Sequence, residues 1–430
     1  ERVHLMGMGG AGMASLAKLL SGMGFQVSGC DLSRGESVQE LEALGMECLP
    51  GHSRDHVERF DPQLLIYSSA VDEDCDELEA ARARGVRTVG RGRALSWLFN
   101  AASGVGVAGT HGKTTTTSMI AEILLEADWD PTVTVGGMMR DIGGNIRVGQ
   151  SENFIAEACE YTNSFLSFYP TIEVVLNVEA DHLDFFKDLE DIRHSFRRFT
   201  EKLPENGLLV INRDIPHYEY FTEGLRCRVL TYGHDRDADY TANFISYDHY
   251  AHPSYTLFER GKELGPISLG VTGEHNIYNS LSAIAVGRAL GIELETIRRA
   301  LHRFQGTDRR FQKKGEVCGF TIIDDYAHHP QEIAATIEAA KKYPHRKLWV
   351  AFQPHTYSRT AALMDDFAGA LSQADEIVLA DIYAAREKNT VGVSSEDLRR
   401  HMLEQNTNVY YIPDFQRIED FLMERLQPGD

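Results

Sequence analysis

The sequence predicts an α/β protein built mainly on parallel sheets, and three observations support this class. Short apolar runs typical of strands alternate with helical periodicity through almost all of the 430 residues. Two glycine-rich turns, at residues 7–12 and 109–112, each follow an apolar run and open a helical stretch. A helix N-terminus that follows a strand and a glycine-rich turn can bind a phosphate. The length favours two or three domains, and we place the boundaries at residues 102/103 and 305/306.

The first block, residues 1–102, alternates between the two patterns from its start. We expect these elements in chain order: strand Val3–Met6, helix Gly12–Ser21, strands Gln26–Cys30, Gln63–Tyr67 and Val86–Val89, and helix Arg93–Phe99. The small residues that follow at 101–104 mark the first boundary.

The second block, residues 103–305, has helical and strand-like stretches around a turn-rich middle. We expect strand Val105–Ala108, helix Lys113–Ala127, strands Phe154–Ala158 and Glu173–Val178, helix Asp188–Lys202, antiparallel strands within Val229–Gly270, and helices Asn276–Leu290 and Leu294–Phe304.

The third block, residues 306–430, returns to regular alternation. We expect strand Phe320–Asp324, helix Gln331–Lys342, strand Lys347–Phe352, helix Arg359–Leu371, strand Glu376–Leu379, helix Glu396–Leu403, strand Val409–Ile412 and a terminal helix.

Composition excludes several classes of protein. With 43 Lys+Arg against 64 Asp+Glu, the net charge of −21 disfavours a general nucleic-acid binder. The 6 cysteines are scattered without a CxxC pair, which argues against a disulfide framework or a structural zinc site. No apolar run approaches the ~20 residues that span a bilayer, so we expect a cytoplasmic protein that does not bind membranes. The missing initiator Met and the abrupt end suggest trimmed termini.

The strongest local pattern is the loop Gly109–Thr115, which follows one predicted strand and opens a helix. Backbone N–H groups of such a loop face a polyphosphate, Lys113 reaches the β/γ-phosphates, and the Thr114 hydroxyl reaches Mg²⁺. The eight-residue pattern GxxxxGK[ST] is incomplete, because Val107 stands at its first glycine. An incidental glycine turn is the alternative, and the order of strand, loop and helix disfavours it.

Candidate metal ligands follow two further strands. Glu157 ends one predicted strand, and the acid-rich segment 177–184, which contains His182, follows another. The carboxyl ends of strands are the usual position for a site in an α/β sheet. An ordinary strand-end charge for Glu157 and a packed imidazole for His182 remain the alternatives.

The first glycine turn fits a dinucleotide-binding pattern. Gly7, Gly9 and Gly12 form GxGxxG, and Asp31 ends the next predicted strand ~20 residues beyond. An NAD site, a nucleotide-sugar diphosphate site and simple tight packing all satisfy this turn. A second phosphate loop on the same chain disfavours a pure dehydrogenase.

Taken together and in order, the motifs of this chain resemble the Mur ligase family. They are GMGGAGM at 7–13, SSA at 68–70, GTHGKTTTT at 109–117, NVEADHLD at 177–184, EHNIYN at 274–279, GTDRRF at 306–311, DDYAHHP at 324–330 and FQPHTYSRT at 352–360.

The resemblance implies three domains: a Rossmann-like domain at 1–102 for a UDP-sugar, a central P-loop ATPase domain with a mixed sheet at 103–305, and a C-terminal Rossmann-like ligase domain at 306–430. It implies ATP-dependent joining of L-alanine to the lactyl carboxylate of UDP-N-acetylmuramate through an acyl phosphate, in peptidoglycan precursor synthesis. The implied cofactors are ATP and Mg²⁺, with Mn²⁺ as a substitute metal, and the implied oligomeric state is a monomer or weak homodimer. A ligase that attaches a preformed tripeptide to the same sugar, and a P-loop nucleotide-binding protein without ligase activity, are the alternatives.

The resemblance also implies roles for individual residues. Catalytic roles fall to Lys113, Glu157, His182, His328 and Arg359. ATP contacts fall to Gly109, Thr110, His111, Gly112, Lys113, Thr114, Thr115, Asn276, Asn279, Arg310 and Asp325. Contacts with the sugar nucleotide and alanine fall to Gly9, Gly10, Ala11, Gly12, Asp31, Ser68, Ser69, Tyr326, His328, His355 and Arg359. The metal ligands are Thr114, Glu157 and His182.

Two departures from the family pattern matter for the site. Thr356 stands where many relatives carry an arginine, so one cation for a substrate carboxylate is absent. The segment 193–196 offers no lysine where several sister ligases carry a carbamylated one, so we do not expect that modification here.

Overall fold

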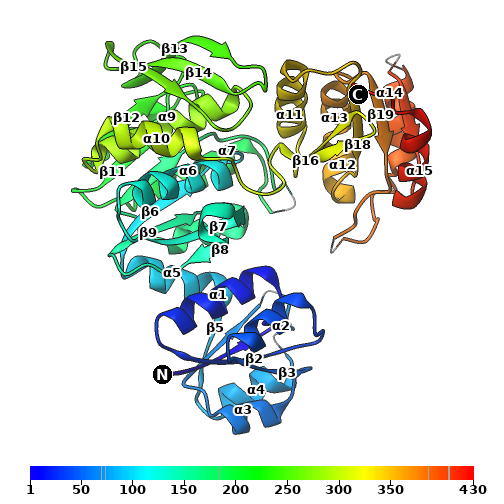
Figure 1. Ribbon diagram of the computed structural model, residues 1–430. Helices are drawn as coiled ribbons and strands as arrows, with labels where there is room; N and C mark the ends of the chain where they lie inside the picture. Colours follow the sequence, from blue (N-terminus) through cyan, green and yellow to red (C-terminus); the bar gives the residue numbers. More distant parts are fainter. Residues whose placement is uncertain (69, 73, 184, 386, 405–406) are drawn as a thin grey trace. The chain divides into compact units, whose positions relative to one another are not determined.

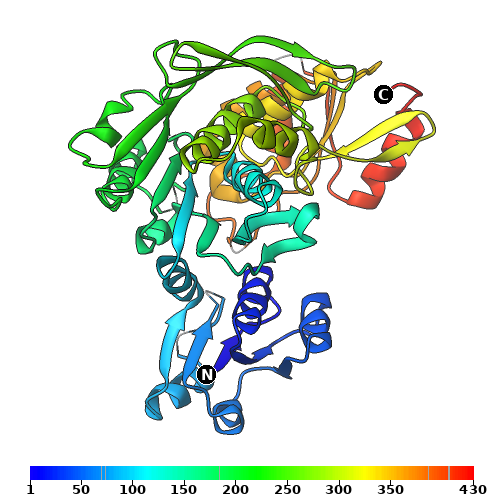
Figure 2. The same ribbon diagram turned by 60° about the vertical axis from the view of Figure 1, so that its left-hand side comes forward.

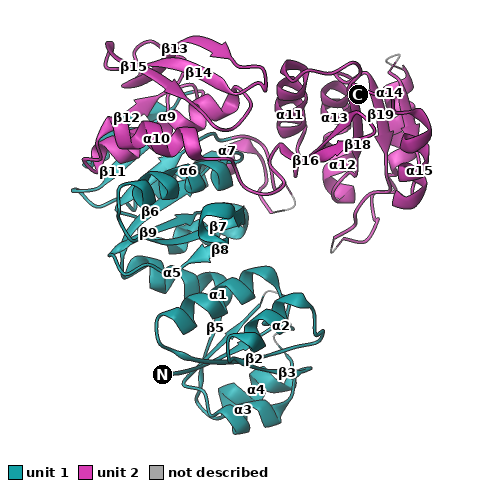
Figure 3. Ribbon diagram, in the orientation of Figure 1, with its two compact units in different colours: residues 1–178, 193–211, 217–230 teal, residues 179–192, 212–216, 231–430 magenta. Residues whose placement is uncertain are grey.

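The computed structural model describes residues 1–68, 70–72, 74–183, 185–385, 387–404 and 407–430 (Figure 1). The chain forms two compact units (Figure 3). Unit 1 comprises residues 1–178, 193–211 and 217–230, and unit 2 comprises residues 179–192, 212–216 and 231–430. The predicted boundaries at 102/103 and 305/306 lie between secondary-structure elements, after helix α5 and after helix α10.

The N-terminal part of unit 1 is a five-stranded parallel sheet in the order β3-β2-β1-β4-β5. Its strands are β1 (Arg2–Met6), β2 (Gln26–Asp31), β3 (Glu47–Pro50), β4 (Leu64–Tyr67) and β5 (Arg87–Gly90). Its helices are α1 (Ala11–Gly22), α2 (Glu36–Ala43), α3 (Arg54–Phe60), α4 (Asp76–Ala83) and α5 (Arg91–Asn100). Helix α1 packs with α2 and α5, and α3 packs with α4, so both faces of the sheet are covered (Figures 1 and 2).

This strand order confirms the Rossmann-like prediction for the first block. The order reverses between β1 and β4, and ligands of such sheets bind outside the carboxyl ends of the strands at that reversal. The first glycine turn directly follows β1 and therefore lies at this position.

The rest of unit 1 surrounds the second glycine loop. Strands β11, β10, β6, β9, β7 and β8 are neighbours in that order, and all of these pairs are parallel except the antiparallel pair β7–β8. These elements are β6 (Ser103–Ala108), α6 (Lys113–Glu126), β7 (Thr132–Met139), η1 (Arg140–Ile142), β8 (Gly144–Arg147), β9 (Asn153–Glu157), η2 (Tyr161–Ser167), β10 (Ile172–Val175), α7 (Leu189–Thr200), β11 (Leu208–Asn212), α8 (Glu219–Thr222) and β12 (Arg228–Tyr232). Residues of α6 are buried on every face, so the helix after the loop is a core element.

Unit 2 contains an antiparallel meander, β13 (Tyr240–Tyr247), β14 (Pro253–Glu259) and β15 (Lys262–Ser268), followed by α9 (His275–Ala289) and α10 (Leu294–Arg303). These strands confirm the antiparallel prediction for the middle of the second block. The mixed sheet is confirmed as well, because β12 meets β13 in parallel at Tyr232 and Tyr240.

The C-terminal part of unit 2 contains a parallel sheet in the order β18-β19-β20, with helices around it. Its elements are α11 (Pro330–Lys342), β18 (Trp349–Phe352), α12 (Tyr357–Ala362), α13 (Met364–Leu371), β19 (Glu376–Leu379), α14 (Ser395–Glu404), β20 (Val409–Tyr411) and α15 (Phe415–Arg425). Helix α11 begins at Pro330 with a capping box. The His329 side chain accepts a hydrogen bond from the backbone N–H of Gln331, and the Glu332 side chain accepts one from the backbone N–H of His329.

Strand β17 (Phe320–Asp324) has the bounds that were predicted for it. It pairs antiparallel with β16 (Gln312–Val317), a strand that was not predicted, in a separate two-stranded sheet. The partner was missed because β16 is polar and largely exposed, so it lacks an apolar period. Within the described residues, no helix is both long and apolar enough to cross a membrane.

Candidate active site

The glycine turn after β1 is held by the acid that ends β2. Gly7 has φ +77°, and the N–H of Gly9 donates to Oδ2 of Asp31 at 2.8 Å. A Cβ on Gly9 would lie 2.8 Å from Val38 and 3.0 Å from that carboxylate, so a side chain there would force these neighbours to shift. Asp31 also accepts from the N–H of Ser33 at 2.9 Å. The structure therefore gives Asp31 a positioning role for the turn, and its contact with substrate stays a prediction.

Other groups surround the same turn. Gly10 is the N-cap of α1 and Ala11 is its first residue, so their N–H groups belong to the helix end that favours anions. Ser68 lies beside Gly7, while Ser69, also predicted for this site, is outside the described residues. The guanidinium of Arg91 is 3.1 Å from the position of a Cβ on Gly12, which brings to the turn a cation that the sequence analysis did not assign.

The loop after β6 has the backbone of a phosphate-binding loop. Gly109 and Gly112 have φ +148° and +81°, values that favour glycine. Asn177 braces the loop: its side chain accepts from the N–H of His111 at 2.8 Å and donates to the carbonyl of His111 at 3.1 Å, while its carbonyl accepts from the N–H of Thr110. The loop is thereby tied to the end of the neighbouring strand β10.

Lys113 is held beside an acid. Its Nζ lies 3.0 and 3.2 Å from the two carboxylate oxygens of Glu160 and also donates to the carbonyls of Gly109 and Thr110. The side chains of Lys113 and Glu160 are only 15% and 3% exposed. Burial alone would lower the pKa of Lys113. The Glu160 carboxylate more than offsets this effect, so the pKa of Lys113 lies above its ordinary value. Lys113 is therefore a fixed cation at the mouth of the loop.

Thr114 and Glu157 adjoin one small space. A Cβ on Gly136 would be 2.9 and 3.0 Å from the Glu157 carboxylate oxygens and 3.1 Å from Oγ1 of Thr114, and Gly136 donates its N–H to Glu157. A hydroxyl and a carboxylate are hard oxygen donors of the kind that Mg²⁺ takes. These residues therefore fit the predicted magnesium site. His182 belongs to unit 2, and its assignment as a third ligand stays a prediction.

The two predicted asparagines form a pair at the start of α9. Nδ2 of Asn276 donates to the carbonyl of Thr272 at 2.7 Å, and Nδ2 of Asn279 donates to Oδ1 of Asn276 at 2.9 Å. Both residues are buried. The structure joins these two side chains by a hydrogen bond, and their contact with nucleotide stays a prediction.

Asp325 lies close to Arg310 because its carboxylate binds the backbone of the next residue, Phe311. Asp325 accepts from the N–H of Phe311, the residue after Arg310, and from the N–H of Ala327, both at 2.7 Å. Burial raises the pKa of Asp325 above its ordinary value, although both hydrogen bonds act to lower it. The guanidinium of Arg310 lies 3.7 Å from Glu332.

Four residues predicted for the acceptor side lie together in unit 2. Ring centroids of Tyr326 and His328 are 5.3 Å apart, and those of His328 and His355 are 5.7 Å apart. Arg359 reaches Nδ1 of His355 at 3.4 Å and donates to Asp181 at 3.1 Å. Burial lowers the pKa of both His328 and His355. Both imidazoles are therefore biased toward the neutral form, and a neutral imidazole can accept a proton.

His182 joins this group through its neighbour. Asp181 accepts from the backbone N–H of His182 at 2.7 Å with the same oxygen that faces Arg359. His182 has φ +53°, a conformation that is uncommon outside glycine and often marks functional sites. The structure thus links two predicted catalytic residues, His182 and Arg359, through an acid that was not assigned.

Comparison with known proteins agrees with this arrangement. Three profiles match along the chain: "Mur ligase family, catalytic domain" at residues 2–103, "Mur ligase middle domain" at 107–287 and "Mur ligase, glutamate ligase domain" at 309–430. A UDP-N-acetylmuramate–L-alanine ligase of Lachnospira eligens is 49% identical over 432 residues, which cover 100% of this chain and 94% of that protein. The chain belongs to the Mur ligase family.

Further members of the Mur ligase family are similar over the whole chain. A UDP-N-acetylmuramate–L-alanine ligase of Agathobacter rectalis is 49% identical and covers 100% of this chain and 93% of that protein. The crystal structure of the UDP-N-acetylmuramate-alanine ligase MurC of Thermotoga maritima matches with a TM-score of 0.81 at 28% identity, covering 100% of this chain and 94% of that one. The three-domain Mur ligase architecture is therefore shown for this chain.

Sequence reasoning missed five residues that the structure places at the sites. They are Arg91, Gly136, Glu160, Asn177 and Asp181. Asn177 and Asp181 lie in the segment 177–184, which the sequence analysis had singled out for its acids and His182. Their polar side chains in that segment could therefore have identified them. Arg91, Gly136 and Glu160 reach their sites only through the fold.

Proposed function

We propose that this protein is an ATP-dependent ligase that joins L-alanine to the lactyl carboxylate of UDP-N-acetylmuramate. The observation that carries the proposal is the loop after β6, where the buried cation Lys113 stands beside the oxygen pair of Thr114 and Glu157. This combination serves phosphoryl transfer, because it neutralises phosphate oxygens and fixes their position. The names of the full-length relatives support the choice of acceptor and sugar.

The chemistry requires activation of the carboxylate, because an oxide ion cannot leave when an amine attacks. A lactyl carboxylate oxygen attacks the γ-phosphorus of ATP, the bond to the β,γ-bridging oxygen breaks, and ADP leaves with that electron pair. The neutral amine of L-alanine then attacks the acyl carbon of the resulting acyl phosphate. The carbon–oxygen bond to phosphate breaks, phosphate leaves, and the nitrogen loses a proton to give the amide.

Residues of unit 1 act on the nucleotides in this proposal. The N–H groups of the loop bind the ATP phosphates, and Lys113 exchanges its contact with Glu160 for the β/γ-phosphates. Mg²⁺, held by Thr114 and Glu157, supplies positive charge against the phosphate oxygens when it is bound. The turn after β1 binds the diphosphate of the UDP-sugar, with Arg91 beside it.

Arg359 and His328 of unit 2 act on the acceptor in this proposal. Arg359 offers a guanidinium for a carboxylate, a pairing that this side chain makes with two parallel hydrogen bonds. His328 accepts the proton that the alanine ammonium must lose, since burial lowers its pKa and keeps the imidazole neutral near pH 7. Asn276, Asn279, Arg310 and Asp325 contact the nucleotide in this assignment.

The test is a phosphate-release assay with the purified chain. Phosphate release is expected only when ATP, UDP-N-acetylmuramate and L-alanine are all present, and Lys113→Ala is expected to abolish it. A tripeptide that replaces L-alanine with higher kcat/KM would identify the recycling ligase instead. ATP hydrolysis that is independent of both other substrates would identify a P-loop protein without ligase activity.

A further inference from the structure

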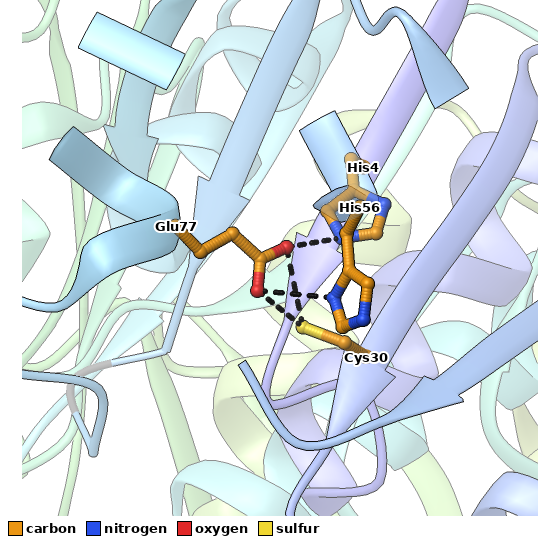
Figure 4. Close-up of side chains that lie close together, drawn as sticks. All are labelled: His4, Cys30, His56 and Glu77. Carbon is orange, nitrogen blue, oxygen red and sulfur yellow. Dashed lines mark hydrogen bonds and ion pairs between the residues drawn. The ribbon is translucent and has the colours of Figure 1, made fainter. Parts of the chain in front are cut away.

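Four side chains capable of binding metal meet in the N-terminal part of unit 1, and none of them is among the residues assigned above (Figure 4). They are His4 of β1, Cys30 of β2, His56 of α3 and Glu77 of α4. All four residues are buried, and one donor atom from each lies within 4.8 Å of all the others.

The Glu77 carboxylate is the centre of the cluster. Its Oε1 lies 2.8 Å from Nε2 of His4, and its Oε2 lies 3.2 Å from Nδ1 of His56. The Cys30 sulfur lies 3.6 and 3.4 Å from these two oxygens. Two imidazole nitrogens, a sulfur and a carboxylate oxygen thus converge from four separate elements, as the dashed lines in Figure 4 show.

The donor types select one class of ion. Thiolate and imidazole favour zinc over magnesium or calcium, and two nitrogens, one sulfur and one oxygen are donors that zinc takes in its four-coordinate sites. The charges also balance, since a thiolate and a carboxylate together neutralise a divalent cation while both imidazoles stay neutral. Such neutrality matters because an uncompensated charge is costly in a buried site.

Surrounding groups orient these donors as in known metal sites. Nδ1 of His4 lies 3.0 Å from Oγ of Ser28, which fixes the ring so that Nε2 faces the cluster. The N–H of Ser53 donates to Glu77 at 3.0 Å. His52 lies 3.2 Å from the Cys30 sulfur, and its side chain is 17% exposed, so it stands between the cluster and solvent.

We propose that His4, Cys30, His56 and Glu77 bind one zinc ion that joins β1 and β2 to α3 and α4. The ion is structural, because all four protein ligands close its coordination sphere. Cys30 precedes Asp31, the residue that holds Gly9, so the ion also steadies the strand that supports the first glycine turn. The spacing of these residues in the chain resembles no zinc motif, which is why the scattered cysteines had argued against a structural zinc site.

The test is a cobalt titration of the full chain, stripped of metal with a chelator and kept in excess Mg²⁺. Co²⁺ is expected to bind at one equivalent with a thiolate-to-cobalt absorption band, and Zn²⁺ is expected to displace it. Cys30→Ser is expected to lose the band. Cys48→Ser is the matched control, because this half-buried cysteine of β3 pairs with Gly29, beside Cys30, yet lies outside the cluster. It is expected to keep the band.

A graded variant separates binding from folding. Ser28→Ala leaves all four ligands in place and is expected to weaken Zn²⁺ binding by about 10- to 100-fold. The wild-type spectrum is decisive even if Cys30→Ser does not fold. Absence of a thiolate band in the wild type, or its retention in folded Cys30→Ser, would overturn the proposal.

Discussion

Gly136→Ala tests the magnesium site directly. The new methyl group would enter the space between Thr114 and Glu157, 2.9 Å from the nearer carboxylate oxygen and 3.1 Å from the hydroxyl. Gly136 does not have a positive φ, so its backbone accepts alanine. The substitution therefore acts on the two proposed ligands and not on the strand.

The magnitude follows from these distances. Ordinary contact begins at 3.4 Å, so the nearer oxygen must retreat by 3.4 − 2.9 = 0.5 Å. Mg²⁺ requires near-ideal geometry at about 2.0–2.1 Å, and a misplacement of about 1 Å costs about 100-fold in rate. Half that shift predicts about a tenfold loss, equivalent to about 1.4 kcal/mol.

The assay is the Mg²⁺ dependence of phosphate release at saturating substrates. At a fixed, sub-saturating Mg²⁺ concentration, the rate of phosphate release by Gly136→Ala is expected to be about tenfold below that of the wild type. Gly144→Ala, on the adjacent strand β8, is the matched control, since the nearest atoms to its Cβ are 3.9 Å away. An unchanged Mg²⁺ dependence in folded Gly136→Ala would refute the assignment of Thr114 and Glu157 as ligands.

Three further predictions concern buried charges. Glu160→Gln removes the carboxylate partner of the largely buried Lys113 and is expected to lower the free energy of unfolding by about 3–5 kcal/mol. Saturating ATP is expected to raise the Tm of this variant more than that of the wild type. Equal increases in Tm would contradict the exchange of Glu160 for phosphate. Burial raises the pKa of Glu173, so the folded chain keeps a proton that the unfolded chain loses above its ordinary pKa of 4.5. Wild-type stability is therefore expected to fall relative to Glu173→Gln by about 1.4 kcal/mol per pH unit as pH rises above that value, as measured by urea unfolding; a difference that does not change with pH would argue against a buried protonated acid. Burial lowers the pKa of His328 below 6.5, so the acidic limb of the pH profile of kcat/KM is expected below that pH. This limb is expected to be absent in His328→Asn but present in His355→Asn. An acidic limb that survives in His328→Asn would exclude His328 as the base.

Much of the fold could be predicted, because most elements have a local signal. The strands β1, β6 and β19 are short buried runs, and the two glycine turns announce the helices that follow. Strand β16 had no such signal, since its side chains are polar and its partner is the adjacent strand β17. Its pairing depends on a turn at Cys318 and Gly319, both with positive φ, which the sequence pattern did not reveal.

The candidate sites were predictable where their residues are contiguous. The loop at 109–115 was found because its glycines, lysine and threonine stand together. Gly136 and Glu160 come from separate segments and reach the loop only when β9 pairs with β6 and β7 pairs with β9. The cluster of His4, Cys30 and Glu77 was missed for the same reason.

The pairing of Lys113 with Glu160 has a consequence for inhibitor design. A neutral compound that binds at the loop must either leave the ion pair of Lys113 and Glu160 intact or separate the two charges without supplying a new partner for either. A compound with an anionic group at that position can give Lys113 a new partner of opposite charge. Screening libraries aimed at this loop should therefore be enriched in phosphonates, sulfonates and carboxylates.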